Sequence, residues 1–508
     1  MTTTKTTTTN PTSCHTAGAP PPSALPLIAS YTAKDVCLYA ISLGFGDGSG
    51  GEQQQEQHAT SSNYERDLPF VYERHAQFSI VPTFALALLF WAQPKNGDEN
   101  NNNRTGSTVI HNAILPSFPP PCMTGMGVPL PKQFWKETIH HSRSQPLSSY
   151  PVIHMFQSIS WKYPPRNHDR PYSLAVPLPS SSSSSNNNNS HHHHHHHHNP
   201  TSNQSCVVEL TSQLLSIRPT SIGTWVTSEI QLQQDHVTKC CMRSTMLVWG
   251  LPPDQVIPYQ RPIESSLSSR QPCTATRDAP GWWSFREAQK NGLVVLWKET
   301  LWTVPMNAAL LYRLASGDSN DIHVDPSQTP ALVLPKQQQE HDDEEESNNK
   351  KSKQPQLIVH GLYTLGVVAR MLIQHSLANS GSDSGGVQVG ISIQHMEAQF
   401  VKPVCVGDSI VIQCWKKKTN QPQQKQQQQQ PSMTTANPSK QVIYFRVLRQ
   451  QQQQQQPLSS SSSSSSNERN RVVVVDQGIA VLLTDHEATT TTTTTTTTGN
   501  EPSQQSRL

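Results

Sequence analysis

Two segments of this chain are apolar on nearly every face of the helix that they would form. Phe78–Trp91 has Pro82 near its start, and Leu362–Ile373 carries Leu, Val and Ala at helical spacing. A helix without a polar face has to be surrounded by other elements. Strand-like runs follow each of these two segments, so the same order occurs twice, and any fold of the chain must enclose both helices.

The remaining patterned segments complete this repeat. Shorter helices are predicted over Tyr31–Leu43, which Thr32 caps with Asp35 and Gly44 ends, and over Asn307–Ala315. Strands are predicted over Val207–Leu215, Gly223–Leu232, Thr238–Trp249, Val387–Phe400, Ser409–Trp415, Val442–Leu448 and Val472–Leu483, with a turn at Gly407–Asp408. A helix wrapped by its own antiparallel sheet, present twice, predicts an α+β double hot-dog fold.

Uncharged polar runs dilute the composition to 34% hydrophobic and 15% charged residues over 508 positions. They include Ser180–Ser185, Asn186–Asn189, His191–His198, Gln426–Gln430, Gln450–Gln456, Ser459–Ser466 and Thr489–Thr498. Such runs bury too little apolar surface to offset their conformational entropy. Loop closure becomes costlier only slowly with length, so we expect these runs as long insertions in an ordinary core.

The runs set the expected domain boundaries. We expect a disordered tail over 1–25, an N-terminal hot-dog over 26–260 with an insertion at about 178–204, a linker over 261–290, a C-terminal hot-dog over 291–486 with insertions at about 330–356, 419–440 and 450–470, and a second disordered tail over 487–508.

Charge and cysteine usage exclude several classes of protein. The net charge of +2 argues against a nucleic-acid binder that works through a broad basic surface. The longest apolar stretch is far shorter than the ~20 residues that span a bilayer, and Met1–Asn10 lacks the apolar region of a secretory signal. Nine cysteines without a Cys-x-x-Cys pair predict no disulfide framework and no zinc site. We therefore expect a soluble intracellular protein.

The last three residues are Ser506, Arg507 and Leu508. This small–basic–leucine tripeptide is close to the Ser-Lys-Leu address that the peroxisomal import receptor reads. It predicts a location in the peroxisomal matrix, with the import receptor as a partner.

One short segment, Tyr312–Pro326, contains an acid, an amide and an imidazole after a glycine. If the loop after Gly317 curls, Asp318 and His323 reach the same water molecule, and a carboxyl and an imidazole that share a water can perform general acid–base catalysis. Asn320 would hold the water or the loop through its amide. The alternative is an Asx-type turn beside a structural histidine.

A second candidate feature is His360-Gly361, which opens the apolar helix at Leu362. The free amides at a helix N-terminus suit a developing negative charge, and glycine lets a carbonyl oxygen come close. Together with an acid–base pair, such a donor supplies what the addition of water to a carbonyl-conjugated double bond requires. The alternative is an ordinary helix start after a turn.

These segments resemble enoyl-CoA hydratase 2 of the MaoC-like double hot-dog family. Tyr312–Pro326 is similar to the family signature, and similar blocks occur in the same order over about half of the chain: Tyr31–Ala40, Asp67–Glu73, Phe78–Phe84, the weaker Val152–His154 with Gln157 and Lys162, Leu357–Arg370 and Phe400–Gly407. The family includes the hydratase part of the peroxisomal multifunctional β-oxidation enzyme and a stand-alone plant form, which this chain resembles more.

The resemblance implies reversible hydration of trans-2-enoyl-CoA to (3R)-3-hydroxyacyl-CoA, with an acyl-CoA thioester as substrate and no metal or cofactor. Whether the protein forms a homodimer stays open. Two alternative functions also stay open: a hot-dog thioesterase and a non-catalytic acyl-CoA-binding protein. By the resemblance the N-terminal half lodges the acyl chain and the C-terminal half catalyses. It assigns the following roles: Asp318 and His323 act on the water, Asn320 supports the loop, Gly361 binds the thioester oxygen, and Glu73, His360, Tyr312 and Gly317 contact the substrate.

The chain departs from the family signature at several positions. Ala315 is an extra residue, Asp321 replaces a proline and adds negative charge near the predicted site, and Thr329 stands where Ala or Ser is usual. The insertion Pro330–Gln356 separates the acid–base pair from His360.

Overall fold

The computed structural model describes residues 26–47, 60–75, 77–94, 152–162, 174, 205–261, 292–326, 357–379, 391–417, 439–450 and 471–484. The predicted tails, the linker and the low-complexity insertions lie outside these residues, apart from short stretches at their edges. The domain boundaries therefore stay predictions.

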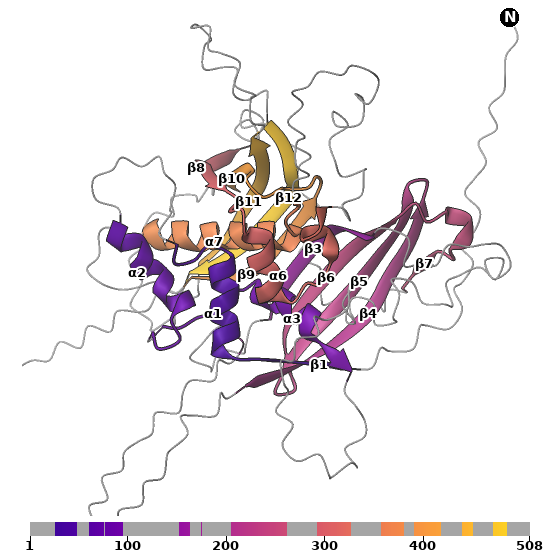
Figure 1. The fold of residues 1–508 in the computed structure, drawn as a ribbon, viewed down its shortest axis with the longest axis horizontal. Coiled ribbons are helices and arrows are strands. Elements are labelled where there is room, and N and C mark those ends of the chain that lie inside the picture. Colours follow the sequence, from indigo (N-terminus) through magenta and orange to yellow (C-terminus); the bar gives the residue numbers. More distant parts are fainter. Residues whose placement is uncertain are drawn as a thin grey trace, which may run out of the picture.

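Within the described residues, the strands form one antiparallel sheet of 12 strands in the order β2-β1-β4-β5-β6-β3-β9-β12-β11-β10-β8, with β7 paired to β4 beside this path (Figure 1). Their bounds are β1 Leu27–Tyr31, β2 Gln93–Pro94, β3 Val152–Trp161, β4 Cys206–Thr220, β5 Gly223–Gln234, β6 Val237–Trp249, β7 Tyr259–Gln260, β8 Leu293–Thr303, β9 Ile391–Phe400, β10 Ser409–Lys417, β11 Ser439–Gln450 and β12 Arg471–Thr484.

The strand order reads the same from both sides of the β3–β9 junction. On one side it runs β3, β6, β5, β4, β1, and on the other β9, β12, β11, β10, β8. The junction is a ladder in which Phe156 pairs with Gln399 and Ser160 with His395. The chain thus builds the same five-strand unit twice, and the two units share one continuous sheet.

Each unit encloses one apolar helix. The helices are α1 Ala33–Ser42, α2 Thr60–Val71, α3 Phe84–Trp91, α6 Ala308–Ser316 and α7 Gly361–Asn379, with short 3-10 turns η4 Pro253–Gln255 and η7 Asp321–His323. Figure 1 shows α7 against the strands of the second unit, while the long strands β4–β6 extend past the shorter α3. This is the predicted α+β double hot-dog.

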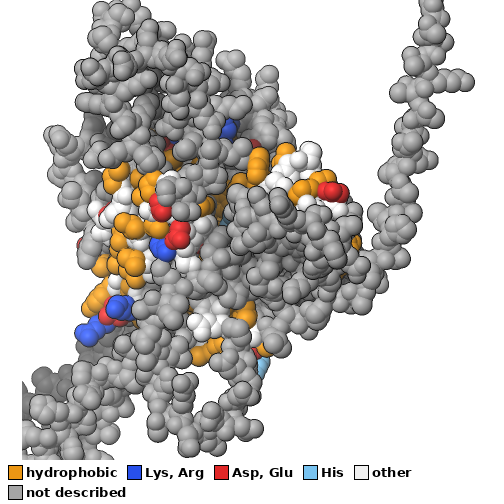
Figure 2. All heavy atoms as spheres, turned by 45° about the vertical axis from the view of Figure 1, so that its right-hand side comes forward, with side chains coloured by type: hydrophobic (Ala, Val, Ile, Leu, Met, Phe, Trp, Pro, Cys, Tyr) orange, Lys and Arg blue, Asp and Glu red, His pale blue; other side chains and the backbone are white. Residues whose placement is uncertain are grey.

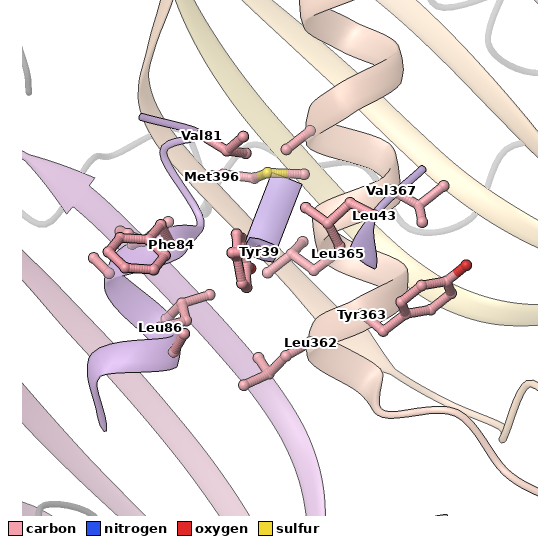
Figure 3. Packing of buried hydrophobic residues seen from close by; sticks show 14 of the residues in the cluster. Tyr39, Leu43, Val81, Phe84, Leu86, Leu362, Tyr363, Leu365, Val367 and Met396 are labelled. Atoms are coloured by element: carbon pink, nitrogen blue, oxygen red, sulfur yellow. The ribbon is translucent and has the colours of Figure 1, made fainter. Parts of the chain in front are cut away.

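The core joins the two apolar helices through α1 and α6. In Figure 3, Leu362 and Leu365 of α7 point toward Tyr39 of α1 and Phe84 of α3, and all four side chains are buried. The ring of Tyr39 lies edge-on to Phe84, with the centroids 5.4 Å apart, and 5.9 Å from Tyr312 of α6. Helices of the first unit therefore support the segment of the second unit that leads to Asp318.

Local sequence explains many element ends, but several predicted ends were wrong. The helix α7 runs on to Asn379 and the strand β4 to Thr220, past the predicted ends at Ile373 and Leu215, and two helix starts also differ. Thr32 and Asp35 form the predicted capping box, but the helix starts at Ala33, because Tyr31 is the last residue of β1. The first apolar helix starts at Phe84 and not at Phe78, since residues 78–83 are not helical and mostly buried. Their apolar side chains fill the core without a helical backbone, which residue type alone does not distinguish.

The described surface carries both signs of charge. On the face shown in Figure 2, Lys and Arg side chains lie among acidic and hydrophobic ones, in line with the near-neutral sequence. Within the described ranges, no helix combines the length and hydropathy needed to cross a bilayer.

Candidate active site

The end of α6 turns the chain so that Asp318 faces inward. Gly317 adopts φ +74°, a left-handed conformation that glycine accepts without steric cost, and its N–H donates to the carbonyl of Arg313 at 2.9 Å. The amide of Asp318 then donates to Ser316 Oγ at 3.2 Å. The side chain of Asp318 ends up buried, 6% exposed.

Asn320 joins the acid to the turn that carries the imidazole. Its backbone N–H donates to Asp318 Oδ1 at 3.1 Å, and its side-chain Oδ1 accepts from the amide of Ile322 at 3.4 Å. The second bond caps the short turn η7, whose last residue is His323. Asn320 is thus the supporting residue of the loop, one of the two roles that its residue type suggested.

A backbone carbonyl fixes the tautomer of His323. Its Nδ1 lies 2.9 Å from the carbonyl oxygen of Ile358. A carbonyl oxygen only accepts, so Nδ1 carries the proton and Nε2 keeps the free lone pair of the neutral ring. Nε2 is therefore the atom of His323 that can take a proton from water.

His360 completes the cluster from the start of the apolar helix. Its ring stacks on the ring of His323, with centroids 3.6 Å apart, and lies 4.9 Å from the ring of Tyr312. His360 Nε2 is 3.6 Å from Asp318 Oδ2. Asp318, His323 and His360 each offer a possible metal-ligand atom, and these atoms lie within 4.8 Å of one another.

Burial sets the protonation states of the cluster. It raises the pKa of the Asp318 carboxyl to about 7, opposed by the hydrogen bond from the Asn320 amide and by the charge of Arg313. Burial also lowers the pKa of His323 to about 4, although the bond to the Ile358 carbonyl works the other way. The pKa of His360 is well below its usual value, first through burial and then through the neighbouring His323. A carboxyl that titrates near neutrality therefore faces two neutral imidazoles.

Gly361 is the first residue of α7, whose leading amides have no acceptor inside the helix. A Cβ at this position would lie 3.1 Å from the ring of Phe400, a tight contact that a larger residue could make only if the ring moved by a few tenths of an ångström. The edge of Phe400 faces His154 of β3, with ring centroids 5.2 Å apart. The helix start therefore lies beside the junction of the two units.

The other predicted substrate contacts divide into two groups. Tyr312 and Gly317 belong to the same buried cluster as Asp318. Glu73 follows α2 and lies beside Cys37 of α1: burial raises the pKa of the Cys37 thiol to about 11, and the charge of Glu73 adds to this while a hydrogen bond with its backbone opposes it. The predicted contact of Glu73 with the substrate stays a prediction.

The structure shows the surroundings of two residues that depart from the family signature, Asp321 and Ala315. Asp321 is 69% exposed and forms an ion pair with Arg313 at 3.3 Å, so the negative charge points away from the buried cluster. It begins η7, where a proline is also compatible with the backbone. Ala315 extends α6 by one buried residue. The negative charge that Asp321 adds is thus paired with Arg313 at the surface, and Asn320 caps the turn that Asp321 begins.

Sequence reasoning missed three contributors. A backbone carbonyl such as that of Ile358 cannot be recognised from residue type. No sequence pattern relates Ile358 to His323 across the insertion between them. Ser316 and Tyr39 were present in the quoted segments, but their roles depend on contacts that only the fold creates. A helix that ends in Ser-Gly-Asp was the one available signal for Ser316.

One protein-family model matches part of the C-terminal half of the chain. Residues 341–440 match the family model of the MaoC like domain, about a fifth of the chain. The match includes His360 and Gly361 and begins after Asp318 and His323. The C-terminal half is therefore similar to a MaoC like domain over these residues.

Solved structures similar to the chain include a MaoC-like dehydratase from Phytophthora capsici, at 16% identity and a TM-score of 0.44, covering 92% of this chain and 97% of that one. The full-length peroxisomal multifunctional enzyme type 2 from Drosophila melanogaster is similar at 15% identity and a TM-score of 0.40, covering 90% of this chain and 48% of that one. Likenesses this distant do not carry an activity to the chain.

Proposed function

We propose that the protein hydrates trans-2-enoyl-CoA to (3R)-3-hydroxyacyl-CoA and catalyses the reverse dehydration. One observation carries the proposal: a carboxyl with a pKa of about 7 and an imidazole with a free Nε2 are buried together beside a helix N-terminus. This set provides an acid, a base and an amide donor, the three groups that the reaction needs. The MaoC-like match over the helix start supports the same assignment.

In the proposed reaction His323 Nε2 removes a proton from water while the oxygen attacks the β carbon. Protonated Asp318 gives its proton to the α carbon, and the N–H of Gly361 stabilises the enolate-like thioester oxygen. The imidazolium left at His323 readily yields its proton, because burial keeps its pKa at about 4. The Asp318 carboxylate, with the higher pKa, accepts that proton and the pair returns to its starting state.

The first unit is proposed to take the acyl chain. Its apolar helix α3 has 8 residues where α7 has 19, so α3 covers less of the face of its long strands. The junction contact between Phe400 and His154 links the helix start to this unit. We extend the proposal to a peroxisomal location, which rests on Ser506–Leu508 alone and is tested by fluorescent fusions with and without that tripeptide.

The experiment is a hydration assay with the purified full-length chain. Loss of the enoyl-thioester absorbance is followed with crotonyl-CoA and decenoyl-CoA, and the configuration of the 3-hydroxy product is determined. We expect turnover to the 3R product with no free CoA. Release of CoA without hydration would indicate a thioesterase, and equal inertness of the wild type and Asp318→Asn would contradict the enzyme assignment.

A further inference from the structure

In the Asp318–His323–His360 cluster, the ring nitrogens of His360 have no role in the proposed hydration reaction. Both ring nitrogens of His360 are buried and lack a hydrogen-bond partner among the residues that the structure describes. Buried polar atoms usually have such a partner, and each exception calls for an explanation. The polar atom that faces His360 Nε2 is Asp318 Oδ2 at 3.6 Å, too far for a hydrogen bond.

The three side chains offer a recognisable set of metal ligands. Two imidazole nitrogens and one carboxylate oxygen suit late first-row divalent ions such as Zn²⁺ or Co²⁺, whereas Mg²⁺ and Ca²⁺ prefer oxygen ligands. His323 is oriented by the Ile358 carbonyl through Nδ1, the kind of outer contact that metal-binding histidines have. This contact leaves Nε2 of His323 available for an ion.

The spacing permits coordination after a small side-chain movement. At Zn–ligand distances of about 2.0–2.2 Å, neighbouring ligand atoms lie roughly 3.3 Å apart. Asp318 Oδ2 and His360 Nε2 are already 3.6 Å apart. All the ligand atoms lie within 4.8 Å of one another, so the separations have to shrink by at most about 1.5 Å, and the stacked rings have to rotate.

We propose that Asp318, His323 and His360 bind a late first-row divalent ion, and that the bound ion blocks the acid–base site. The ion would use His323 Nε2 and Asp318 Oδ2, the atoms proposed to handle the two protons of the reaction. Binding therefore excludes hydration. The inhibitory part of this inference rests on the proposed hydratase function, whereas the binding part does not.

The test uses the full-length chain with His191–His198 replaced by serine, because a run of eight histidines itself binds such ions. Zn²⁺ is titrated by calorimetry and Co²⁺ by its visible absorption. We expect one ion per chain, and at least tenfold weaker binding in His360→Gln and in Asp318→Asn. The control is His236→Asn, an exposed residue in the turn between β5 and β6 with φ +60°, a conformation that asparagine tolerates.

Kinetics separate the two parts of the inference. Zn²⁺ is expected to abolish hydration and EDTA to restore it. Unchanged Zn²⁺ affinity in both site variants, or no binding at all, would overturn the metal site even if the enzyme is active. An increase in hydration with Zn²⁺ would overturn the blocking role. If no hydration is detected, the calorimetric titration still tests the site, and circular dichroism establishes that each variant is folded.

Discussion

Both units place an aspartate directly after a glycine in the loop that follows a short helix, and the two aspartates have different surroundings. Asp47, after α1, is 35% exposed and pairs with the buried guanidinium of Arg370 at 3.3 Å. Asp318, after α6, is buried and faces His323 and His360, and its carboxyl has a pKa of about 7. The partner and the depth of burial make one carboxylate a structural ion-pair member and the other a candidate acid.

The apolar helices differ in a matching way. The 8 residues of α3 include no titratable side chain, whereas α7 follows directly on His360 and carries Arg370 in its buried stretch. One scaffold is thus used twice, once to complete the core and once to position polar groups at a helix start. The chemistry is expected to depend on the second unit, and the first to contribute support through Tyr39.

The largest expected effect separates the two aspartates. Asp318→Asn removes the proposed acid and is expected to lower kcat/KM for enoyl-CoA hydration by about 10³-fold, within the range for general acid–base residues. Asp47→Asn is expected to change kcat/KM less than threefold, because its partner is structural. Both are measured on purified chains at pH 6.5, and a similar loss in the two variants would contradict the division of roles.

The second largest effect on kcat/KM is expected from the backbone N–H donor of Gly361 at the start of α7. Gly361→Pro removes the N–H at a first helical position, where proline is otherwise favoured, while Gly361→Ala keeps it. Either substituent meets the ring of Phe400, where a Cβ lies at 3.1 Å, so the pair is matched for that contact. We expect kcat/KM of the proline variant to be about 10²-fold below that of the alanine variant. Equal rates would remove Gly361 from the proposed mechanism.

Arg370 is expected to affect stability more than catalysis. Its guanidinium donates to the Leu43 carbonyl and to Asp47, and lies 4.7 Å from the centre of the Trp302 ring. Arg370→Met removes these interactions and is expected to lower the free energy of unfolding by about 2–3 kcal/mol. Thermal melts measure the loss, and kcat/KM at 20 °C should stay within threefold. A catalytic loss without a lower Tm would place Arg370 in the site.

The smallest effect is expected at Asp321, which the sequence had marked as a departure. Its ion pair with Arg313 is exposed on the aspartate side, and such pairs contribute about 0–1 kcal/mol. Asp321→Asn should leave kcat/KM within twofold and Tm nearly unchanged. A tenfold change in activity would show that the charge at this position acts on the cluster.

The sequence predicted those features that depend on periodic or contiguous residues. The apolar stretch in α7, the capping box of Thr32 and Asp35, and the strands β4–β6 and β9–β12 follow from spacing. The strand β1 near one edge of the sheet and the edge strand β8 were missed, and so was β3, which joins the units. The strand β1 has only 5 residues, and the pairing of β3 with β9 joins segments from opposite halves of the chain, which no local pattern specifies.

The candidate site likewise contains parts that the sequence predicted and parts that it did not. Asp318, Asn320 and His323 share one short segment, so their proximity was predictable from the sequence. The stacking of His360 on His323 and the bond to the Ile358 carbonyl cross the insertion 330–356, and no local pattern specifies them. The position of Glu73 beside Cys37 likewise depends on how α2 packs on α1.

The most direct test of the proposed acid–base pair is the pH dependence of kcat/KM for enoyl-CoA hydration. Asp318 must be protonated to act as the acid, so activity is expected to fall as the pH rises through about 7. His323 must be neutral to act as the base, so activity is also expected to fall as the pH drops through about 4. A bell-shaped profile with these two limbs is the predicted result. A profile that stays flat from pH 6 to 9 in the wild type would contradict the assignment of Asp318 as the acid.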